Sequence, residues 1–287
     1  MKKYNLLLPI AGRAQRFLDK GYTMPKPLIM SKDKHIIDWS MSSIDTTECN
    51  VIFAVRLEHI NNFSIDDILR EKFGDDIKIV VIDRVTDGSV STCLLAKEHI
   101  NNELPLIIYT PDVYFENKFI PSEIPKDLDG HLLTFKANSS AHSYVELGDN
   151  GLAVRTAEKE VISQNAAVGV YYYKTGKMFV EYAEEMISKN IRTKGEFYIC
   201  PMYNLMIRDG AKVGIQQAEK IADKNNCLLF ATSLHPFARY SDQVLSSHPR
   251  YNRIMDDLQL VGRRFITQGL HVHVGMDDHE AAIRVCD

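Results

Sequence analysis

Residues 6–28 read LLLPIAGRAQRFLDKGYTMPKPL, and this stretch decides the fold that the sequence predicts. The apolar run Leu6–Ile10 is typical of a buried β-strand, because it is brief and is followed directly by turn residues. Ala11 and Gly12 then begin a loop whose small residues let backbone N–H groups approach a phosphate closely. A first strand that leads into such a loop indicates an α/β domain.

Basic residues and prolines follow in the same loop. Arg16 and Lys26 would stabilise the negative charge of a polyphosphate by bidentate and point-charge contacts. Pro25 and Pro27 flank Lys26, and we expect them to hold the backbone extended and to aim the lysine side chain. A solvated loop between a strand and a helix can have the same composition, so these residues alone leave both interpretations open.

Short apolar runs alternate with amphipathic stretches through the first part of the chain. The expected strands are Leu6–Ile10, Val51–Val55, Ile77–Ile82 and Leu106–Tyr109, and the expected helices are Ile36–Ile44, Ile65–Phe73 and Val90–Ile100. This alternation predicts a Rossmann-like, mostly parallel mixed sheet with helices on both faces. Ligands of such sheets bind at the carboxyl ends of the strands.

The middle of the chain is richer in strands. We expect strands at His131–Lys136, Tyr144–Leu147, Leu152–Ala157 and Ala166–Tyr173, and helices at Lys177–Lys189 and Tyr198–Arg208. Residues 149–151 (Asp-Asn-Gly) suit a hairpin turn, and Gly210 suits the end of the last helix. An α/β half followed by a sheet-rich lobe would form a cleft with a nucleotide on one side and an acceptor on the other.

Composition excludes several classes of protein. The 287 residues carry a net charge of −4, which argues against a nucleic-acid or membrane-surface partner, since either favours a basic protein. Five scattered cysteines without a C-x-x-C pair indicate free thiols in a reducing compartment. The N-terminal apolar run is too short for a signal peptide or a membrane span. We therefore expect a cytoplasmic protein, and its oligomeric state, including a homo-oligomer, stays open.

Several spaced motifs together resemble the sugar-phosphate nucleotidyltransferases, whose signature loop is G-x-G-x-R followed by P-K-P. The resemblance begins with LPIAGRAQRF and PKPLI and continues in the family's order over about residues 1–215. Its further motifs are DGSVSTCLLAKE (87–98), PLIIYTPDVYF (105–115), AEK (157–159) and GEFYICPMYN (195–204). The resemblance implies that residues 1–215 form a nucleotidyltransferase domain. This domain would transfer a nucleoside monophosphate from CTP, UTP or dTTP to a small phosphorylated acceptor, with a sugar phosphate as the leading candidate, as in surface-polysaccharide pathways.

By this resemblance each motif has a role. Ala11 and Gly12 line the nucleotide, Arg16 and Lys26 act on its phosphates, and the backbone of Gly88 and Ser89 lies against the base. Asp112, which follows a strand, would hold the catalytic Mg²⁺, an ion that prefers oxygen ligands and takes many of them from substrate phosphates. A turn aspartate at the end of a strand is the alternative interpretation of Asp112.

The acceptor would lie in the sheet-rich lobe. Glu158 and Lys159 resemble the family's Glu-Lys pair that holds it, and Tyr144, Lys174 and Glu196 are further candidates for the same pocket. A surface ion pair, a half-buried aromatic residue and solvated charges are equally good interpretations of these last three.

The chain departs from the family pattern at two places. Ala14 replaces the second glycine of the loop, which allows close approach to the phosphates if its φ is negative. After Val213 nothing matches the family's C-terminal segment, so Asp223 stands only roughly where a second metal ligand would fall, and a catalytically weak nucleotide-binding module is an alternative function.

The C-terminal segment, residues 216–287, resembles a different family. Its motifs are LLFATSLHPFARYSDQ (228–243), PRYNRIMDDLQLVGRRF (249–265) and GLHVHVGMDDHEAAIRV (269–285), which are similar to an internal part of carboxylate–amine ligases related to glutamate–cysteine ligase. His271 and His273 would share one face of a strand, either near a ligand or packed in a core. An ATP-dependent ligase fragment is the third candidate function.

Overall fold

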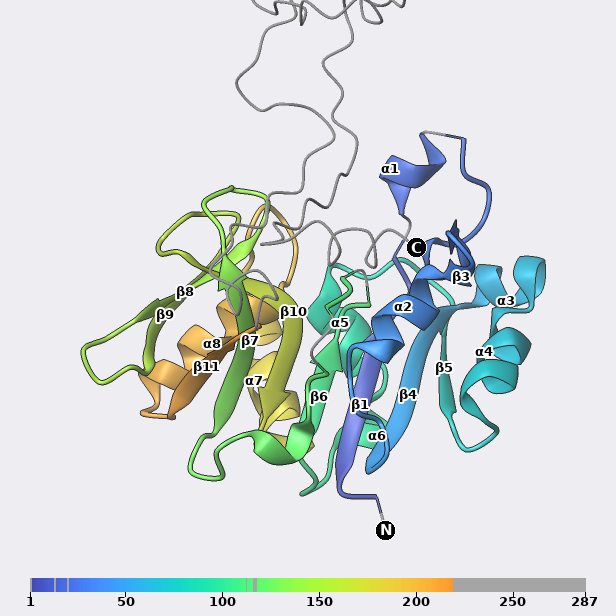
Figure 1. Ribbon diagram of the computed structural model, residues 1–287. Helices are drawn as coiled ribbons and strands as arrows, with labels where there is room; N and C mark the ends of the chain where they lie inside the picture. The colour runs from blue at the N-terminus through green and yellow to red at the C-terminus, as the bar shows by residue number, and fades with distance from the viewer. Residues whose placement is uncertain (1, 13, 20, 112, 116–117, 219–287) are drawn as a thin grey trace, which may run out of the picture. The chain divides into compact units, whose positions relative to one another are not determined.

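A mixed sheet of nine strands organises the part of the chain that the structure describes (Figure 1). This computed structural model describes residues 2–12, 14–19, 21–111, 113–115 and 118–218, without the side chain of Arg16. These residues lie in one compact unit that spans residues 1–219. The three C-terminal motifs within residues 228–285, together with Asp223, His271 and His273, lie outside the described residues.

Four parallel strands form one half of the sheet. β1 (Tyr4–Pro9) lies between β4 (Cys49–Arg56) and β6 (Leu106–Tyr109), and β5 (Lys78–Ile82) pairs with the far side of β4. The chain thus leaves β1 toward β4 and β5 and returns to the other side of β1 for β6. The strand order reverses between β1 and β6, which is the place where open α/β sheets bind ligands.

The other half of the sheet is mixed. β10 (Asn165–Tyr173) runs antiparallel to β6 on one side and to β7 (Gly130–Lys136) on the other. β11 (Val213–Gln217) adds a parallel strand beyond β7. The hairpin of β8 (Ser143–Leu147) and β9 (Ala153–Glu158) is attached to the start of β10, and forms the sheet-rich lobe that the sequence predicts.

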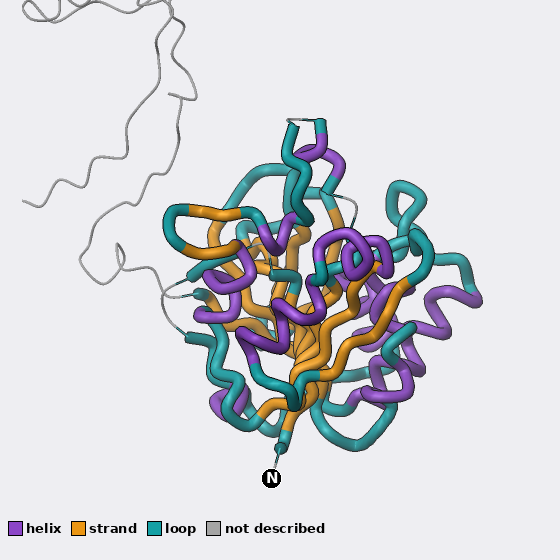
Figure 2. Tube along the Cα trace, turned by 90° about the vertical axis from the view of Figure 1, so that its right-hand side faces the viewer, coloured by secondary structure: helices purple, strands orange, loops and turns teal. Residues whose placement is uncertain are grey.

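Helices cover both faces of the sheet (Figure 2). One face carries α2 (Ile36–Ser42), α3 (Leu57–Phe63) and α4 (Ile65–Phe73), and the other carries α5 (Ser89–Leu94), α6 (Lys97–Ile100), α7 (Gly176–Ser188) and α8 (Ile199–Arg208). In β1, Leu6 and Leu8 pack on the first side and Leu7 on the second, and none of the three is exposed. The strand reads as an unbroken apolar run because each face buries its side chains, at about 1.5–3 kcal/mol for each leucine.

The fold class predicted from the sequence is confirmed, and all but one of the expected elements match within two residues at each end. The expected helix Val90–Ile100 is instead two helices, α5 and α6. Leu95 and Ala96 donate their N–H groups to carbonyls three residues back, at 3.2 and 3.0 Å, which tightens the chain and ends α5. Gly210 has the positive φ (83°) of a helix C-terminus, as predicted.

Several short elements were not predicted. They are α1 (Gln15–Leu18), η1 (Lys26–Leu28), the hairpin of β2 (Met30–Ser31) and β3 (Lys34–His35), helix α3, η2 (Pro121–Glu123) and β11. β11 extends to Gln217, and the Ala218 N–H continues its ladder by donating to Thr134 at 2.7 Å. The sheet therefore continues past the predicted domain limit at residue 215.

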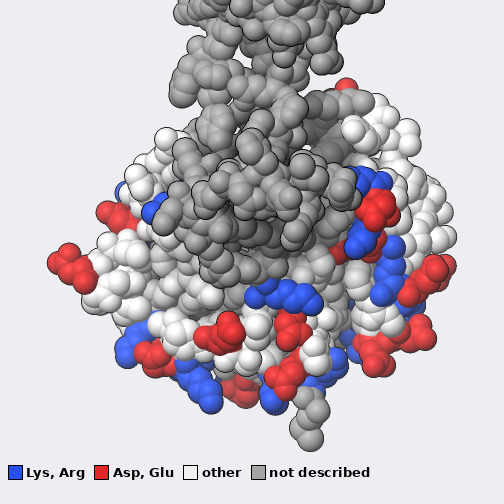
Figure 3. All heavy atoms as spheres, in the orientation of Figure 1, with Lys and Arg blue, Asp and Glu red and all other residues white. Residues whose placement is uncertain are grey.

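Two further observations concern the surface. Among the described residues no helix is long and apolar enough to cross a membrane. On the face shown in Figure 3, basic and acidic side chains of the described residues are interspersed along the rim of the domain.

Candidate functional site

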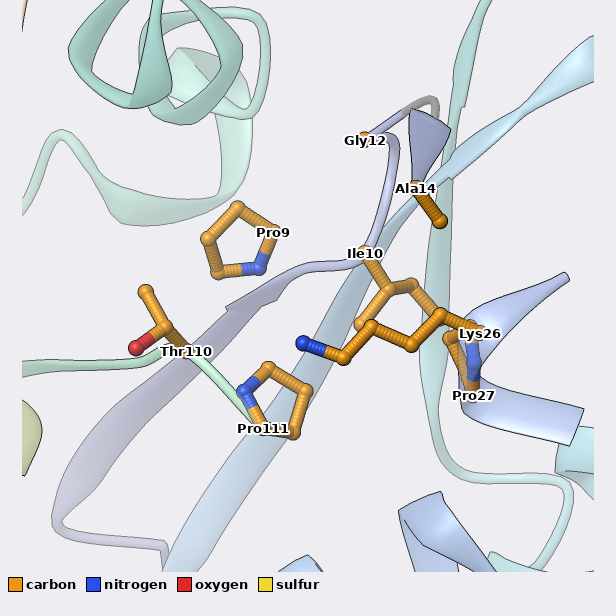
Figure 4. Close-up of a pocket in the computed structure, with 8 residues that line it drawn as sticks. All are labelled: Pro9, Ile10, Gly12, Ala14, Lys26, Pro27, Thr110 and Pro111. Atoms are coloured by element: carbon orange, nitrogen blue, oxygen red, sulfur yellow. The ribbon is translucent and has the colours of Figure 1, made fainter. Parts of the chain in front are cut away.

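A cavity of about 250 Å³ lies where the carboxyl ends of β1 and β6 meet (Figure 4). It is lined by Pro9, Ile10, Gly12, Ala14, Lys26, Pro27, Thr110 and Pro111. The lining thus combines the loop after β1, the Pro-Lys-Pro segment and the chain that follows β6. The cavity lies at the carboxyl ends of the strands, where the strand order reverses and where sheets of this kind bind ligands.

The loop after β1 combines open space with an unfavourable backbone conformation. A Cβ atom at Gly12 would have no neighbour within 4 Å among the described residues, so none of these fills the space beside the glycine. Ala14 adopts φ 51° and ψ 37°, in the left-handed region that costs an ordinary residue about 1–2 kcal/mol. The negative φ on which close approach to the phosphates was conditional is therefore not the conformation of Ala14, which has a backbone conformation that glycine adopts without strain.

Lys26 crosses the cavity. Its side chain extends from the Pro27 side toward Pro9 and Pro111 in Figure 4, and its Nζ lies 5.7 Å from the centre of the Phe17 ring. Pro25 is extended, as expected (φ −54°, ψ 138°), but Lys26 itself begins the 3₁₀ turn η1. Pro25 and Pro27 have a fixed φ on either side of Lys26, so the backbone that carries the lysine side chain is rigid.

A bulge in β10 shapes the wall at the end of β6. The register of β10 against β7 shifts between Ala167 and Tyr171, and Gly169 in this interval has φ 99°. The Gly169 carbonyl accepts from the Thr110 N–H at 2.9 Å and from the Thr110 hydroxyl at 3.3 Å. A Cβ at Gly169 would lie 2.1 Å from Thr110 Oγ1, so only glycine allows this contact. Sequence reasoning did not identify Gly169, because its partner is 59 residues away.

The chain after β6 is anchored on both sides of residue 112. The buried Tyr109 hydroxyl donates to the Val113 carbonyl at 2.7 Å, and the Phe115 N–H donates to Ser43 Oγ at 2.9 Å. Asp112 itself lies outside the described residues, as does the side chain of Arg16, so their roles stay predictions. Among the described residues, no three His, Cys, Asp or Glu side chains form a group that could hold a metal ion.

The turn at Gly88 and Ser89, predicted to face the base, is covered on one side by Phe197. The Val90 N–H donates to the Phe197 carbonyl at 3.1 Å, and a Cβ at Gly88 would lie 2.5 Å from that oxygen. Gly88 has φ 122°, so both the conformation and the close approach require glycine. Neither residue lines the cavity that contains Lys26.

Glu158 and Lys159 lie at the end of β9 and each has a side-chain partner. Glu158 accepts a hydrogen bond from Ser143, and burial raises the pKa of its carboxyl above the ordinary value. Lys159 Nζ donates to the Tyr198 hydroxyl at 2.6 Å, and this bond raises the pKa of the lysine. Sequence reasoning did not single out Ser143 and Tyr198, since their partners are distant along the chain.

The structure separates the remaining acceptor candidates. Tyr144 is fully buried and donates its hydroxyl to the Ser139 carbonyl at 2.7 Å, so its ring belongs to the core. Lys174 forms an ion pair with Asp129 at 2.9 Å. It follows Tyr173, which pairs with Leu106 at the start of β6, whereas the cavity lies at the other end of that strand. Glu196 is exposed in the loop before α8. The charge of Glu196 raises the pKa of Glu158.

Solved structures of nucleotidyltransferases share this fold. One is a nucleoside-diphosphate-sugar pyrophosphorylase from Vibrio cholerae RC9, with 22% identity, a TM-score of 0.66, and coverage of 74% of this chain and 91% of that chain. Another is the inositol-1-phosphate CTP transferase from T. maritima, with 12% identity, a TM-score of 0.57, and coverage of 75% and 85%. The resemblance predicted from the sequence is confirmed at the level of the fold.

The C-terminal part matches a second family. Residues 207–287 match the model of glutamate-cysteine ligase family 2, a range that begins inside α8 and includes β11. A protein of Solibacter usitatus (strain Ellin6076) named "Putative glutamate--cysteine ligase 2" is 40% identical over 70 residues, which are 24% of this chain and 18% of that protein. The chain spans about a fifth of the length of the curated relatives that it matches. The second resemblance predicted from the sequence is therefore also confirmed.

Proposed function

We propose that the chain is a nucleotidyltransferase that transfers a nucleoside monophosphate to a small phosphorylated acceptor and releases pyrophosphate. One observation carries the proposal: a cavity at the reversal of strand order is bounded by the loop after β1 and the end of β6, and Lys26 extends across it. The left-handed backbone at Ala14 supports a ligand site here, because strained backbone is common at functional sites. The space beside Gly12 would let a phosphate approach the backbone closely.

The reaction needs positioning and charge neutralisation more than a covalent nucleophile. An oxygen of the acceptor phosphate would form a bond to the α-phosphorus, and the bond from that phosphorus to the leaving pyrophosphate would break in line with it. The attacking phosphate is ionised near neutral pH, so no general base is required. Lys26, held between Pro25 and Pro27, would stabilise the charge that develops on the phosphates.

Mg²⁺ is part of this proposal. We propose Asp112 as the residue that holds it, because the aspartate follows the β6 wall and because Mg²⁺ takes much of its coordination from substrate phosphates. The ion would contribute neutralisation of the triphosphate charge. Arg16, in α1 after the same loop, is proposed as a further phosphate contact.

The acceptor is proposed to be a sugar phosphate or a chemically similar small phosphate, and the nucleotide to be CTP, UTP or dTTP. The names of the two similar structures, a nucleoside-diphosphate-sugar pyrophosphorylase and an inositol-1-phosphate CTP transferase, support this range. Glu158 and Lys159 are proposed to hold the acceptor, since the sheet-rich lobe presents both at the end of β9.

A pyrophosphate-release screen tests the proposal. The chain would be incubated with Mg²⁺, each of CTP, UTP, dTTP and GTP, and a panel of sugar phosphates and amino-acid phosphates. We expect release with at least one pair of substrates, and a loss on the order of 10²–10³-fold in Asp112→Ala. Asp127→Ala, which changes an exposed aspartate, is the matched control and should retain full activity.

Two results would replace the proposal with another function. Nucleotide binding without pyrophosphate release for any pair would indicate a binding module. Release of inorganic phosphate from ATP in the presence of glutamate and an amine would indicate a carboxylate–amine ligase, the second candidate, which the family match over residues 207–287 favours.

A further inference from the structure

The segment between α7 and α8 forms a tight two-residue hairpin. Thr193 and Glu196 exchange backbone hydrogen bonds, each at 3.0 Å. Lys194 (φ 49°) and Gly195 (φ 87°) between them both have positive φ, as in a type I′ turn. The hairpin holds Lys194 and Glu196 in fixed places, and the charges of both act on the pKa of Glu158, at the acceptor side of the proposed site.

Arg192 holds this hairpin with its whole guanidinium group. Its Nε donates to Asn190 Oδ1 at 2.7 Å, its Nη1 donates to the Gly195 carbonyl at 2.7 Å, and its Nη2 donates to Asp87 Oδ2 at 2.9 Å. The guanidinium carbon lies 4.0 Å from the centre of the Phe197 ring. A planar arginine can donate along its edge and stack on its face at the same time, which lysine cannot do.

The same contacts reach the turn on the nucleotide side. The Phe197 N–H donates to the Asp87 carbonyl at 2.8 Å, and the Phe197 carbonyl accepts from the Val90 N–H at 3.1 Å. Gly88 lies between them, with no space for a Cβ atom against the Phe197 backbone. Backbone hydrogen bonds thus join Phe197 to the turn that begins at Asp87. Arg192 contacts both partners, because it stacks on the ring of Phe197 and donates to the carboxylate of Asp87.

We propose that Arg192 is a positioning residue that joins the nucleotide-side turn and the acceptor-side hairpin into one rigid unit. The role rests on the proposed function, in which Gly88 and Ser89 face the nucleotide, and Glu158 and Lys159 hold the acceptor. Through its bond to Asp87 and its stacking on Phe197, Arg192 fixes the hairpin before any substrate arrives. The acceptor then binds to a surface that is already ordered, and does not have to order it on binding.

Amide hydrogen exchange of the full chain without substrate tests the clamp directly. In Arg192→Lys, which keeps the charge but removes the stacking and the fork of donors, we expect the Phe197 and Val90 amides to exchange about tenfold faster. Arg208→Lys is the matched control, since the guanidinium of Arg208 likewise donates to several acceptors, the carboxylates of Glu185 and Asp209, but lies at the far end of α8. Exchange at wild-type rates in Arg192→Lys would overturn the proposal.

Steady-state kinetics separates positioning from a general structural role. We expect Arg192→Lys to raise the KM for the acceptor about fivefold to tenfold with less than a twofold change in kcat, because the loss falls on an ordering step before the reaction. Asp87→Asn should raise the acceptor KM by a similar factor. The double variant should raise it by less than the product of the two factors, since both substitutions disrupt the same bond between Arg192 and Asp87.

The outcomes separate this proposal from the proposed function. Faster exchange with an unchanged acceptor KM would overturn the positioning role, because Arg192 would then stabilise the loop without serving the site. If the wild-type chain released no pyrophosphate, the proposed function would fail, and the exchange rates would still decide whether Arg192 clamps the hairpin.

Discussion

The nucleotide side and the acceptor side of the proposed site are built in different ways. Among the described residues, the nucleotide side is formed by small and apolar residues at the ends of β1 and β6, together with the side chain of Lys26. The acceptor side is held by bonds between side chains that are far apart in the sequence, such as Lys159 to Tyr198 and Ser143 to Glu158. The nucleotide side therefore has a cavity in which a polyanion could bind, whereas the charged groups of the acceptor side are held in place by their bonds without a ligand.

Each side also contains a feature that opposes folding, and the two features differ in kind. On the nucleotide side it is the left-handed backbone of Ala14. On the acceptor side it is the Glu158 carboxyl, whose pKa burial raises. Unfavourable features of this kind persist where the surrounding structure fixes them, and are common at functional sites. The comparison makes predictions for both sides.

The largest expected effect is on the nucleotide side, at Lys26. Lys26→Ala removes the cation that crosses the cavity, and we expect pyrophosphate release to fall by about 2–4 kcal/mol of transition-state stabilisation, or on the order of 30- to 1000-fold. The rate is measured with saturating nucleotide and acceptor. Lys126→Ala removes an exposed lysine before β7 and should leave the rate unchanged. Equal rates for Lys26→Ala and the wild type would show that the cavity is not the site of the reaction.

The next effect concerns the wall of the same cavity, at Gly169. Gly169→Ala places a methyl group against Thr110 in a backbone conformation with φ 99°, and we expect a loss of about 2–3 kcal/mol in the free energy of unfolding. Gly151→Ala is the matched control, since Gly151 also has positive φ (75°) but a Cβ there would meet nothing within 4 Å. Chemical denaturation of both variants isolates the clash from the backbone strain. Equal losses would mean that the bulge tolerates a side chain and does not fix Thr110.

A smaller effect, of opposite sign, is expected at Ala14. Ala14→Gly relieves left-handed strain of about 1–2 kcal/mol and adds about 0.4–1 kcal/mol of unfolded-state entropy, so the net gain in stability is about 0.5 kcal/mol. Ala141→Gly is the control, because Ala141 is exposed and has no positive φ, and it should lose stability. Melting temperatures of the two variants provide the measurement. A loss in both would show that Ala14 carries no strain.

The same contrast explains how much of the molecule could be predicted from its sequence. The parallel strands and the pocket after β1 were predictable, because apolar runs and loop residues are local signals. The sequence left the sign of φ at Ala14 open, since side-chain identity does not reveal φ, and the structure gives 51°. Gly169 and Arg192 act through partners 59 and 105 residues away, a relation that no local pattern encodes. The short strand β11 was missed because it is stabilised by hydrogen bonds to β7, a strand distant in the sequence.

The smallest effect is on the acceptor side and depends on pH. Burial raises the pKa of Glu158 above its usual value, so the folded chain binds a proton there more tightly than the unfolded chain does. The wild type therefore loses stability from this group as the pH rises from about 4.5, the ordinary pKa, through the folded pKa. Glu158→Gln has no such loss, so its stability relative to the wild type should increase with pH over this range. The gain is limited, because part of the carboxyl stays in water.

Ser143→Ala tests the pKa of Glu158 by removing the hydrogen bond that lowers it. The Ser143 hydroxyl donates to the Glu158 carboxylate and favours its charged form, which lowers the pKa and opposes the effect of burial. Without this bond the folded pKa of Glu158 rises further, so the variant should lose stability with increasing pH more than the wild type does. Denaturant unfolding at a series of pH values measures both variants. Parallel profiles for Ser143→Ala, Glu158→Gln and the wild type would show that Glu158 is solvated like a surface carboxylate. The acceptor side would then carry no electrostatic counterpart to the strained backbone at Ala14.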